Sequence, residues 1–141
     1  MTIDTSNIIG PDAAQALLAG AVDWTQYDGM RVASHTSAAV YLAIWGQLSW
    51  IPDEATFNSL FADWSGIVNS DYLVDNMPHA SPLANDSFIG ISAASPAEYL
   101  VTFGKKFHIP DQATVSRFNF RGPVSVPHLA LDYIPTGQDV S

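Results

Sequence analysis

The four histidines are the side chains best suited to acid–base chemistry or metal binding near neutral pH. His35 follows a serine, but a serine and a histidine adjacent in sequence rarely form the hydrogen bond that nucleophilic catalysis needs. His108 and His128 lie on or beside predicted strands and could approach one another in a sheet. If the chain is an enzyme, its candidate catalytic residues are His35, His108, His128, Asp132 and Tyr133. Neutral structural histidines are the commoner outcome for such a set.

A second group has the spacing of metal ligands. Asp71, Asp75 and His79 are four residues apart, which on a continuous helix would place all three on one face. Pro78 would interrupt that helix, so we expect no metal site here. Nucleotide-binding loops and metalloenzyme helix motifs are also absent from the sequence, and we predict no cofactor.

Composition excludes several classes of protein. Charged residues make up 13% of the 141 residues, against a globular average of about 25%. Fourteen acidic residues and five Lys and Arg give a net charge of −9, which disfavours nucleic acid and anionic lipid as partners. The absence of cysteine excludes disulfides and thiolate nucleophiles. Residues 38–51 are apolar but too short to span a bilayer, so we expect a soluble protein of unknown compartment.

The charges are unevenly distributed. Residues 1–100 hold eleven acids and a single base, Arg31, whereas four of the five cations follow residue 100. On a predicted hairpin, Lys106, Arg117 and Arg121 would share one face, which could meet the acidic helices of a second subunit. Such a face could also bind an anionic ligand, or it could simply be solvated and discourage aggregation at the sheet edge.

Sixteen aromatic residues are many for a chain of this size. Most are expected in the core, including Trp45 and Trp64. Trp24, Tyr27 and Trp50 lie near predicted element ends and are expected to be partly exposed, where they could anchor an interface or line a pocket.

Helical spacing of apolar residues characterises the first half. It predicts helices over residues 11–22, from residue 36 or 37 to 45, and over 51–68, the last beginning at Ile51-Pro52-Asp53. Residues 30–33 could be a short strand or merely a connector. Residues 69–87 are predicted to be mostly loop, which a helical turn at residues 72–74 would shorten.

Alternation and β-branched residues in the second half predict strands over residues 88–92, 99–107, 113–121 and 124–133. Placing Phe103 opposite Phe118 would join the second and third strands as a hairpin with its loop at residues 109–112. Pro127 indicates an edge strand or a bulge in the last strand.

These patterns predict an α+β fold with three N-terminal helices packed on a C-terminal antiparallel sheet of about four strands. No internal repeat or linker is evident, so residues 1–141 are expected to form a single domain. The helical part would cover about residues 11–68 and the strand part about 87–134, with flexible tails at 1–9 and 135–141.

Two functional hypotheses follow. The first is a non-enzymatic structural or assembly protein acting as a homo-oligomer or within a larger assembly, for example a capsid decoration or connector subunit of a virion. Low charge suits it, because interface centres are depleted in charged residues. The alternative is a small α+β enzyme or ligand-binding domain whose pocket between helices and sheet is lined by His, Asp and Tyr.

Overall fold

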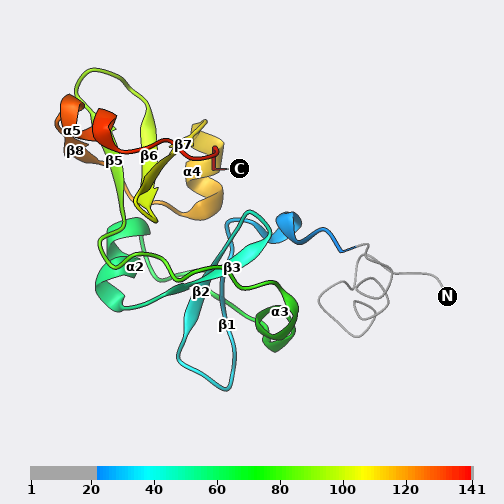
Figure 1. The fold of residues 1–141 in the computed structure, drawn as a ribbon. Helices are drawn as coiled ribbons and strands as arrows, with labels where there is room; N and C mark the ends of the chain where they lie inside the picture. The colour runs from blue at the N-terminus through cyan, green and yellow to red at the C-terminus, as the bar shows by residue number, and fades with distance from the viewer. Residues whose placement is uncertain (1–21, 141) are drawn as a thin grey trace.

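The computed structural model describes residues 22–140 and consists of two consecutive repeats with the same order of elements (Figure 1). The first repeat contains a short 3-10 helix η2 (Trp24–Tyr27), then β1 (Arg31–Ala33), β2 (Val40–Ile44), β3 (Gln47–Ile51), α2 (Glu54–Leu60), β4 (Val68–Asn69) and α3 (Asp71–Asn76). The second contains β5 (Phe88–Ser92), β6 (Glu98–Thr102), β7 (Lys105–Ile109), α4 (Gln112–Phe118), β8 (Val124–Val126) and α5 (His128–Tyr133). The prediction that the chain has no internal repeat is therefore wrong.

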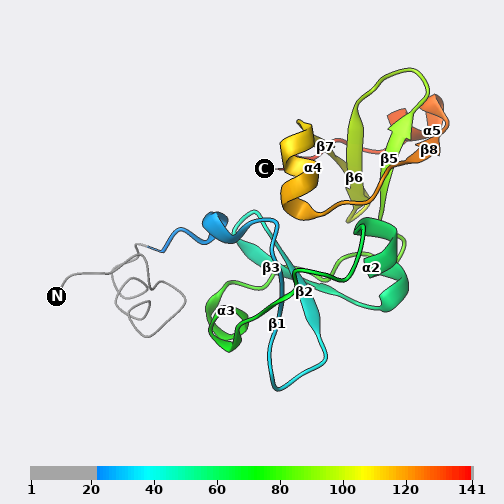
Figure 2. The same cartoon turned by 180° about the vertical axis from the view of Figure 1, so that it is seen from behind.

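Each repeat forms a four-stranded mixed sheet. The strand orders are β3-β2-β1-β4 and β7-β6-β5-β8, and in both sheets the last strand pairs parallel to its neighbour. The two sheets lie one above the other, with α2 and α4 toward their junction (Figures 1 and 2). The predicted architecture of three N-terminal helices on one antiparallel sheet is wrong, because strands and helices alternate along the whole described chain.

The same turn joins the second and third strands of each repeat. Trp45 and Gly46 have positive φ angles of 52° and 73°, and Phe103 and Gly104 have 55° and 69°. Two consecutive positive φ angles define the tight hairpin turn that matches the twist of antiparallel strands. The predicted strand over residues 99–107 is therefore two strands with a turn between them.

Both α2 and α4 begin with the same sequence pattern, Ile-Pro-Asp-x-Ala-Thr. Asp53 Oδ1 accepts hydrogen bonds from Thr56 N–H and Oγ1–H, both at 2.7 Å, and Asp111 Oδ1 accepts the equivalent bonds from Thr114, both at 2.8 Å. These bonds satisfy backbone donors that the first turn of a helix leaves free. The strand predicted over residues 113–121 is consequently the helix α4, and the predicted hairpin with Phe103 opposite Phe118 does not exist.

Other boundaries also differ from the prediction. Residues 36–45, predicted as a helix, contribute β2, because a short apolar run that is rich in β-branched and aromatic residues suits a buried strand. The helix predicted over residues 51–68 is confirmed only as α2, which ends at Leu60. The strand predicted over 124–133 stops at Val126, since α5 begins directly after Pro127.

Several local predictions are confirmed. Residues 31–33 and 88–92 are strands, and the helical turn expected near residue 72 is α3. The predicted helix over 11–22 falls, apart from Val22, outside the described residues, as does the predicted tail 1–9. None of the helices in the described part of the chain has the length and apolar character that crossing a membrane requires.

Matching extended segments line the outer edges of β3 and β7. Leu83 N–H donates to Trp50 O at 2.9 Å, and Val140 N–H donates to His108 O at the same distance. Residues 135–140, which the sequence analysis placed in a tail, therefore lie along β7. Both edges are thereby covered against further strand pairing.

One hydrophobic core joins the two repeats. It contains these fully or nearly fully buried side chains: Leu42, Ile44, Ile51, Phe57, Leu60, Phe61, Leu83, Ile89, Leu100, Phe107, Ile109, Phe118, Phe120 and Val140. At its centre Phe61 and Phe120 pair as an antiparallel bridge directly after α2 and α4, with their rings stacked 6.0 Å apart. Since neither repeat buries this core alone, we expect them to fold together.

A second, smaller core lies on the other face of the first sheet, under η2 and α3. It comprises Tyr27, Val32, Ala43, Leu48, Leu73 and Met77. In the second repeat, Lys106 occupies the strand position of Leu48, and its Nζ donates to Leu131 O at 2.9 Å. The outer face of the second repeat thus lacks an equivalent apolar core.

The shared core leads to a testable expectation. Phe61→Ala and Phe120→Ala should each lower the free energy of unfolding by about 3–5 kcal/mol, because each removes a buried aromatic ring.

All four tryptophans belong to the first repeat, and Trp45 also contacts Phe107 and Asp139 of the second, so their fluorescence reports the first repeat and its contact with the second, whereas far-ultraviolet circular dichroism reports both repeats. Urea transitions followed by the two probes should coincide in the wild type. Separate transitions would contradict a shared folding unit.

The two caps make a further prediction about pH. Hydrogen bonds from Thr56 and Thr114 lower the pKa of Asp53 and of Asp111 below the ordinary value. A carboxyl whose pKa is lower in the folded state stabilises that state at neutral pH, and this stabilisation is lost as the pH falls through the folded pKa. Asparagine also caps helices but does not titrate. In the double variant Asp53→Asn/Asp111→Asn, the urea midpoint of unfolding should therefore fall less between pH 6 and pH 3 than it does in the wild type. Asp86→Asn, which replaces an exposed aspartate, serves as the control and should behave as the wild type does.

Candidate binding site

The structure separates most of the candidate catalytic residues. His35 is exposed beyond β1, with Nδ1 3.5 Å from Asp71 Oδ1, and its backbone N–H donates to the same oxygen at 2.8 Å. His108 lies on β7, where Nδ1 is 3.9 Å from Asp139 Oδ1 and the ring packs beside Tyr99. Each histidine thus has its own local carboxylate, and the two do not meet.

His128 and Asp132 do come together, at the first turn of α5. His128 Nε2 is 3.2 Å from Asp132 Oδ2, and its Nδ1 is 3.5 Å from Ser92 Oγ at the end of β5. The serine hydroxyl also accepts a hydrogen bond from Ala94 N–H at 3.1 Å. Tyr133 is next in the chain, but its side chain projects into solvent and is 88% exposed.

The predicted basic face, with Lys106, Arg117 and Arg121 on one side of a hairpin, does not form. Lys106 is buried, whereas Arg117 and Arg121 are exposed on or just after α4. Arg121 Nη1 donates to Asn58 O at 2.9 Å, which ties it to the end of α2. The cations therefore do not form one face of a hairpin.

The aromatic interface candidates differ in exposure. Tyr27 is buried, and Trp24 is half-buried beside Tyr27 and Tyr72. Trp50 is 42% exposed, as expected for an interface or pocket residue. Trp64, expected in the core, is in fact 44% exposed.

No group of three potential metal ligands occurs among residues 22–140. His79 lies beyond the end of α3, where its Nε2 is 2.7 Å from Val74 O. The spacing of Asp71, Asp75 and His79 therefore does not correspond to a shared metal site.

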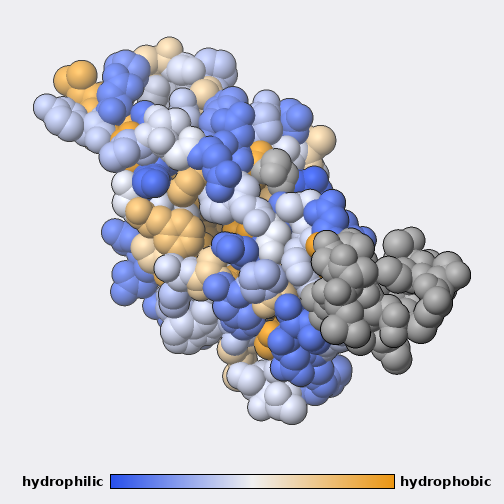
Figure 3. Space-filling model, turned by 45° about the vertical axis from the view of Figure 1, so that its right-hand side comes forward, coloured by the Kyte–Doolittle hydropathy of each residue, from blue (hydrophilic) through white to orange (hydrophobic). Residues whose placement is uncertain are grey.

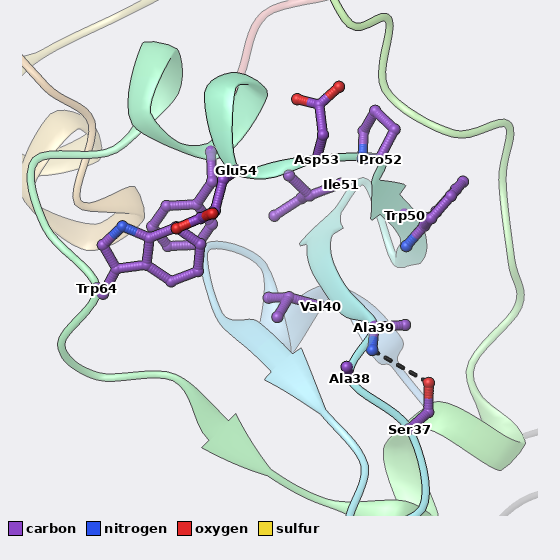
Figure 4. Close-up of a pocket in the computed structure, with 11 residues that line it drawn as sticks. Ser37, Ala38, Ala39, Val40, Trp50, Ile51, Pro52, Asp53, Glu54 and Trp64 are labelled. Carbon is purple, nitrogen blue, oxygen red and sulfur yellow. Dashed lines mark hydrogen bonds between the residues drawn. The ribbon is translucent and has the colours of Figure 1, made fainter.

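A concave site with a volume of about 530 Å³ lies on the first repeat, between β2, β3 and α2. We call it the aromatic cleft. Val40 and Ile51 form its floor, and Trp50 and Trp64 stand on opposite sides of that floor (Figure 4). Most of the molecular face in Figure 3 is hydrophilic, with hydrophobic side chains exposed in a limited patch near its middle.

Two contacts hold Trp64 in the wall of the aromatic cleft. Its ring stacks on Phe57 of α2, with centroids 3.9 Å apart and an interplanar angle of 16°. Its indole Nε1–H donates to Asn58 Oδ1 at 2.8 Å. Trp64 is therefore positioned by α2 even though the helix ends at Leu60, which gives the cleft a pre-formed aromatic wall.

Carboxylates lie at the rim of the aromatic cleft. Asp53 caps α2, and the resulting hydrogen bonds lower its pKa, so it is ionised at neutral pH. Glu54 occupies the first turn of α2 and lines the same cleft as Trp64. Within residues 22–140 neither carboxylate forms an ion pair. The cleft thus combines an apolar floor and aromatic walls with two carboxylates among its lining residues, of which Asp53 is already used in the helix cap.

The second repeat has a corresponding cleft of about 380 Å³, which we call the polar cleft. Each of its lining residues stands 58 positions after a lining residue of the aromatic cleft. Four pairs are identical: Ala39 and Ala97, Ile51 and Ile109, Pro52 and Pro110, Asp53 and Asp111. The remaining differences change its chemistry, because His108 replaces Trp50, Val115 replaces Phe57 and Glu98 replaces Val40.

A convex apolar site lies on α5 of the second repeat. Leu129 and Tyr133 are four residues apart, so they lie on one side of the helix, and they are 73% and 88% exposed. We call this pair the apolar knob. The helix beneath it is fixed through Leu131, whose side chain is buried and whose carbonyl accepts from Lys106.

Sequence reasoning named Trp50 and Tyr133 but did not connect either with its site. The recurrence of Ile-Pro-Asp-x-Ala-Thr was the available signal, because it marks the second cleft once the first is recognised. Comparisons of the chain with protein-family models, with curated proteins and with solved structures found no match.

Proposed function

We propose that this protein is a non-enzymatic assembly component that associates with further copies of itself. The observation that carries the proposal is the pair of exposed apolar sites, the concave aromatic cleft and the convex apolar knob, in one small chain. Exposed large apolar groups that gather in patches are typical of interaction surfaces. Tryptophan and tyrosine are also the residues most enriched among those that dominate binding energy at protein interfaces.

Composition supports the same proposal. A charged fraction of 13% leaves few charges to be desolvated when surface is buried between subunits. A capsid decoration or connector subunit of a virion is a narrower version of this function, in which a small subunit repeats around a ring or lattice.

Light scattering over a concentration series tests the proposed function. We expect the mass to rise above that of the 15.2 kDa monomer with concentration, and to do so at both low and high salt, since apolar contacts are screened little. A monomer at every concentration would contradict self-assembly.

A second candidate, a small hydrolase, rests on Ser92, His128 and Asp132, whose side chains follow one another within hydrogen-bonding range. Such a triad activates a serine nucleophile when the histidine takes its proton. Neither the aromatic cleft nor the polar cleft includes any of the three residues, and the distance of 3.5 Å between Ser92 Oγ and His128 Nδ1 is long for a hydrogen bond.

Covalent labelling separates the two candidates. A fluorophosphonate probe modifies an activated serine, so we expect the wild type and Ser92→Ala to remain equally unlabelled in intact-mass measurements. Ser87→Ala, at another buried serine, serves as the control. Stoichiometric labelling that Ser92→Ala alone abolishes would support the hydrolase and overturn the assignment as non-enzymatic.

A further inference from the structure

We infer that the apolar knob of one copy occupies the aromatic cleft of the next copy, so that the molecules associate head to tail. This inference rests on the proposed self-association and specifies which surfaces meet. It commits to a second copy of this chain as the occupant of the cleft.

The two repeats differ in a way that fits this pairing. In the first repeat the helix equivalent to α5 is α3, where Tyr72 packs against Trp24 of η2, 6.3 Å between ring centroids, and is not free to project. In the second repeat the helix carries the exposed knob, but the polar cleft has His108 and Val115 in place of the aromatic wall. The first repeat therefore offers the aromatic cleft without a knob, and the second repeat offers the apolar knob without an aromatic cleft.

Chemical complementarity supports the pairing. Leu129 and the ring of Tyr133 match the aliphatic floor and tryptophan walls of the cleft. The phenolic O–H of Tyr133 needs an acceptor when its ring is buried. Glu54, a lining residue that forms no ion pair within residues 22–140, provides such an acceptor.

The two repeats differ in net charge. Residues 22–82, which form the repeat with the aromatic cleft, contain seven acidic residues and only Arg31 as a base. Residues 83–140, which form the repeat with the knob, contain five acidic and four basic residues. The net charges are thus −6 and −1, so contact between the two different repeats of neighbouring copies is less repulsive than contact between two first repeats.

The consequence is a heterologous interface. Because the cleft and the knob are different surfaces of one chain, each copy keeps one free site after the first contact forms. Such contacts close into a ring or continue as an open filament. A two-fold dimer, by contrast, would use the same surface on both copies.

Mixing two complementary variants tests this arrangement. Tyr133→Asp damages the knob and leaves the cleft intact, whereas Ala39→Trp fills the cleft and leaves the knob intact. Each alone should be monomeric, with a dissociation constant raised about 30-fold or more, as for the loss of a dominant interface residue. Together they should form a 1:1 heterodimer that grows no further, because only one knob and one cleft remain functional.

Matched controls come from the other repeat. Ala97→Trp changes the equivalent position of the polar cleft, and Asn76→Asp changes an exposed end of α3; both should assemble as the wild type does. If Ala39→Trp loses the circular dichroism of the folded protein, Trp50→Ser replaces it, with His108→Ser as its control.

The outcomes separate the inference from the proposed function. If the wild type assembles but Tyr133→Asp or the folded cleft variant keeps its mass, or if the mixture stays monomeric, the head-to-tail contact is wrong while self-assembly stands. If the wild type is monomeric throughout, the proposed function and the inference both fail.

Discussion

Direct pairing of the segments that follow α2 and α4 is the contact on which the rest of the structure depends. Arg121 N–H donates to Leu60 O and Ala62 N–H donates to Asn119 O, each at 2.9 Å, so the repeats join through backbone as well as through stacked rings. The inner faces of α2 and α4 are buried in the resulting core. Their N-termini remain outside it, and there they border the two clefts. The core thus fixes the helices that shape each potential binding surface.

Divergence between the repeats explains how one scaffold presents two different surfaces. The shared positions are those that the backbone requires, namely the capping aspartates, the positive-φ turns and the buried isoleucines. The varied positions include lining residues of the clefts and the buried position of Leu48 and Lys106. Tryptophan in the aromatic cleft is replaced by His108, and the core residue Leu48 is replaced by Lys106, whose ammonium group is satisfied by a carbonyl of α5. Substitutions at such positions change the chemistry of the surface without changing the topology.

The pattern Ile-Pro-Asp occurs at residues 51–53 and 109–111, and its two occurrences lead to two different predictions. Pro52-Asp53 correctly predicts a helix start. The prediction of a hairpin loop at Pro110-Asp111 is wrong, because it rests on the alternation of Phe118 and Phe120, which resembles a strand. Those two rings face the shared core for a different reason: Phe118 ends a helix, and Phe120 pairs with Phe61 across the junction. Local alternation cannot reveal a partner that lies about 60 residues away.

The sequence by itself determined the features that depend on neighbouring residues. These include the cap of α2, the short strand at residues 88–92 and the absence of cysteine chemistry. Tertiary structure alone decided that residues 40–44 form a buried strand, that Lys106 is buried and that Trp64 is exposed. The physical reason is that burial depends on which distant segments pack together, and here the second repeat supplies them. The aromatic cleft and the apolar knob exist as surfaces only once that packing is complete.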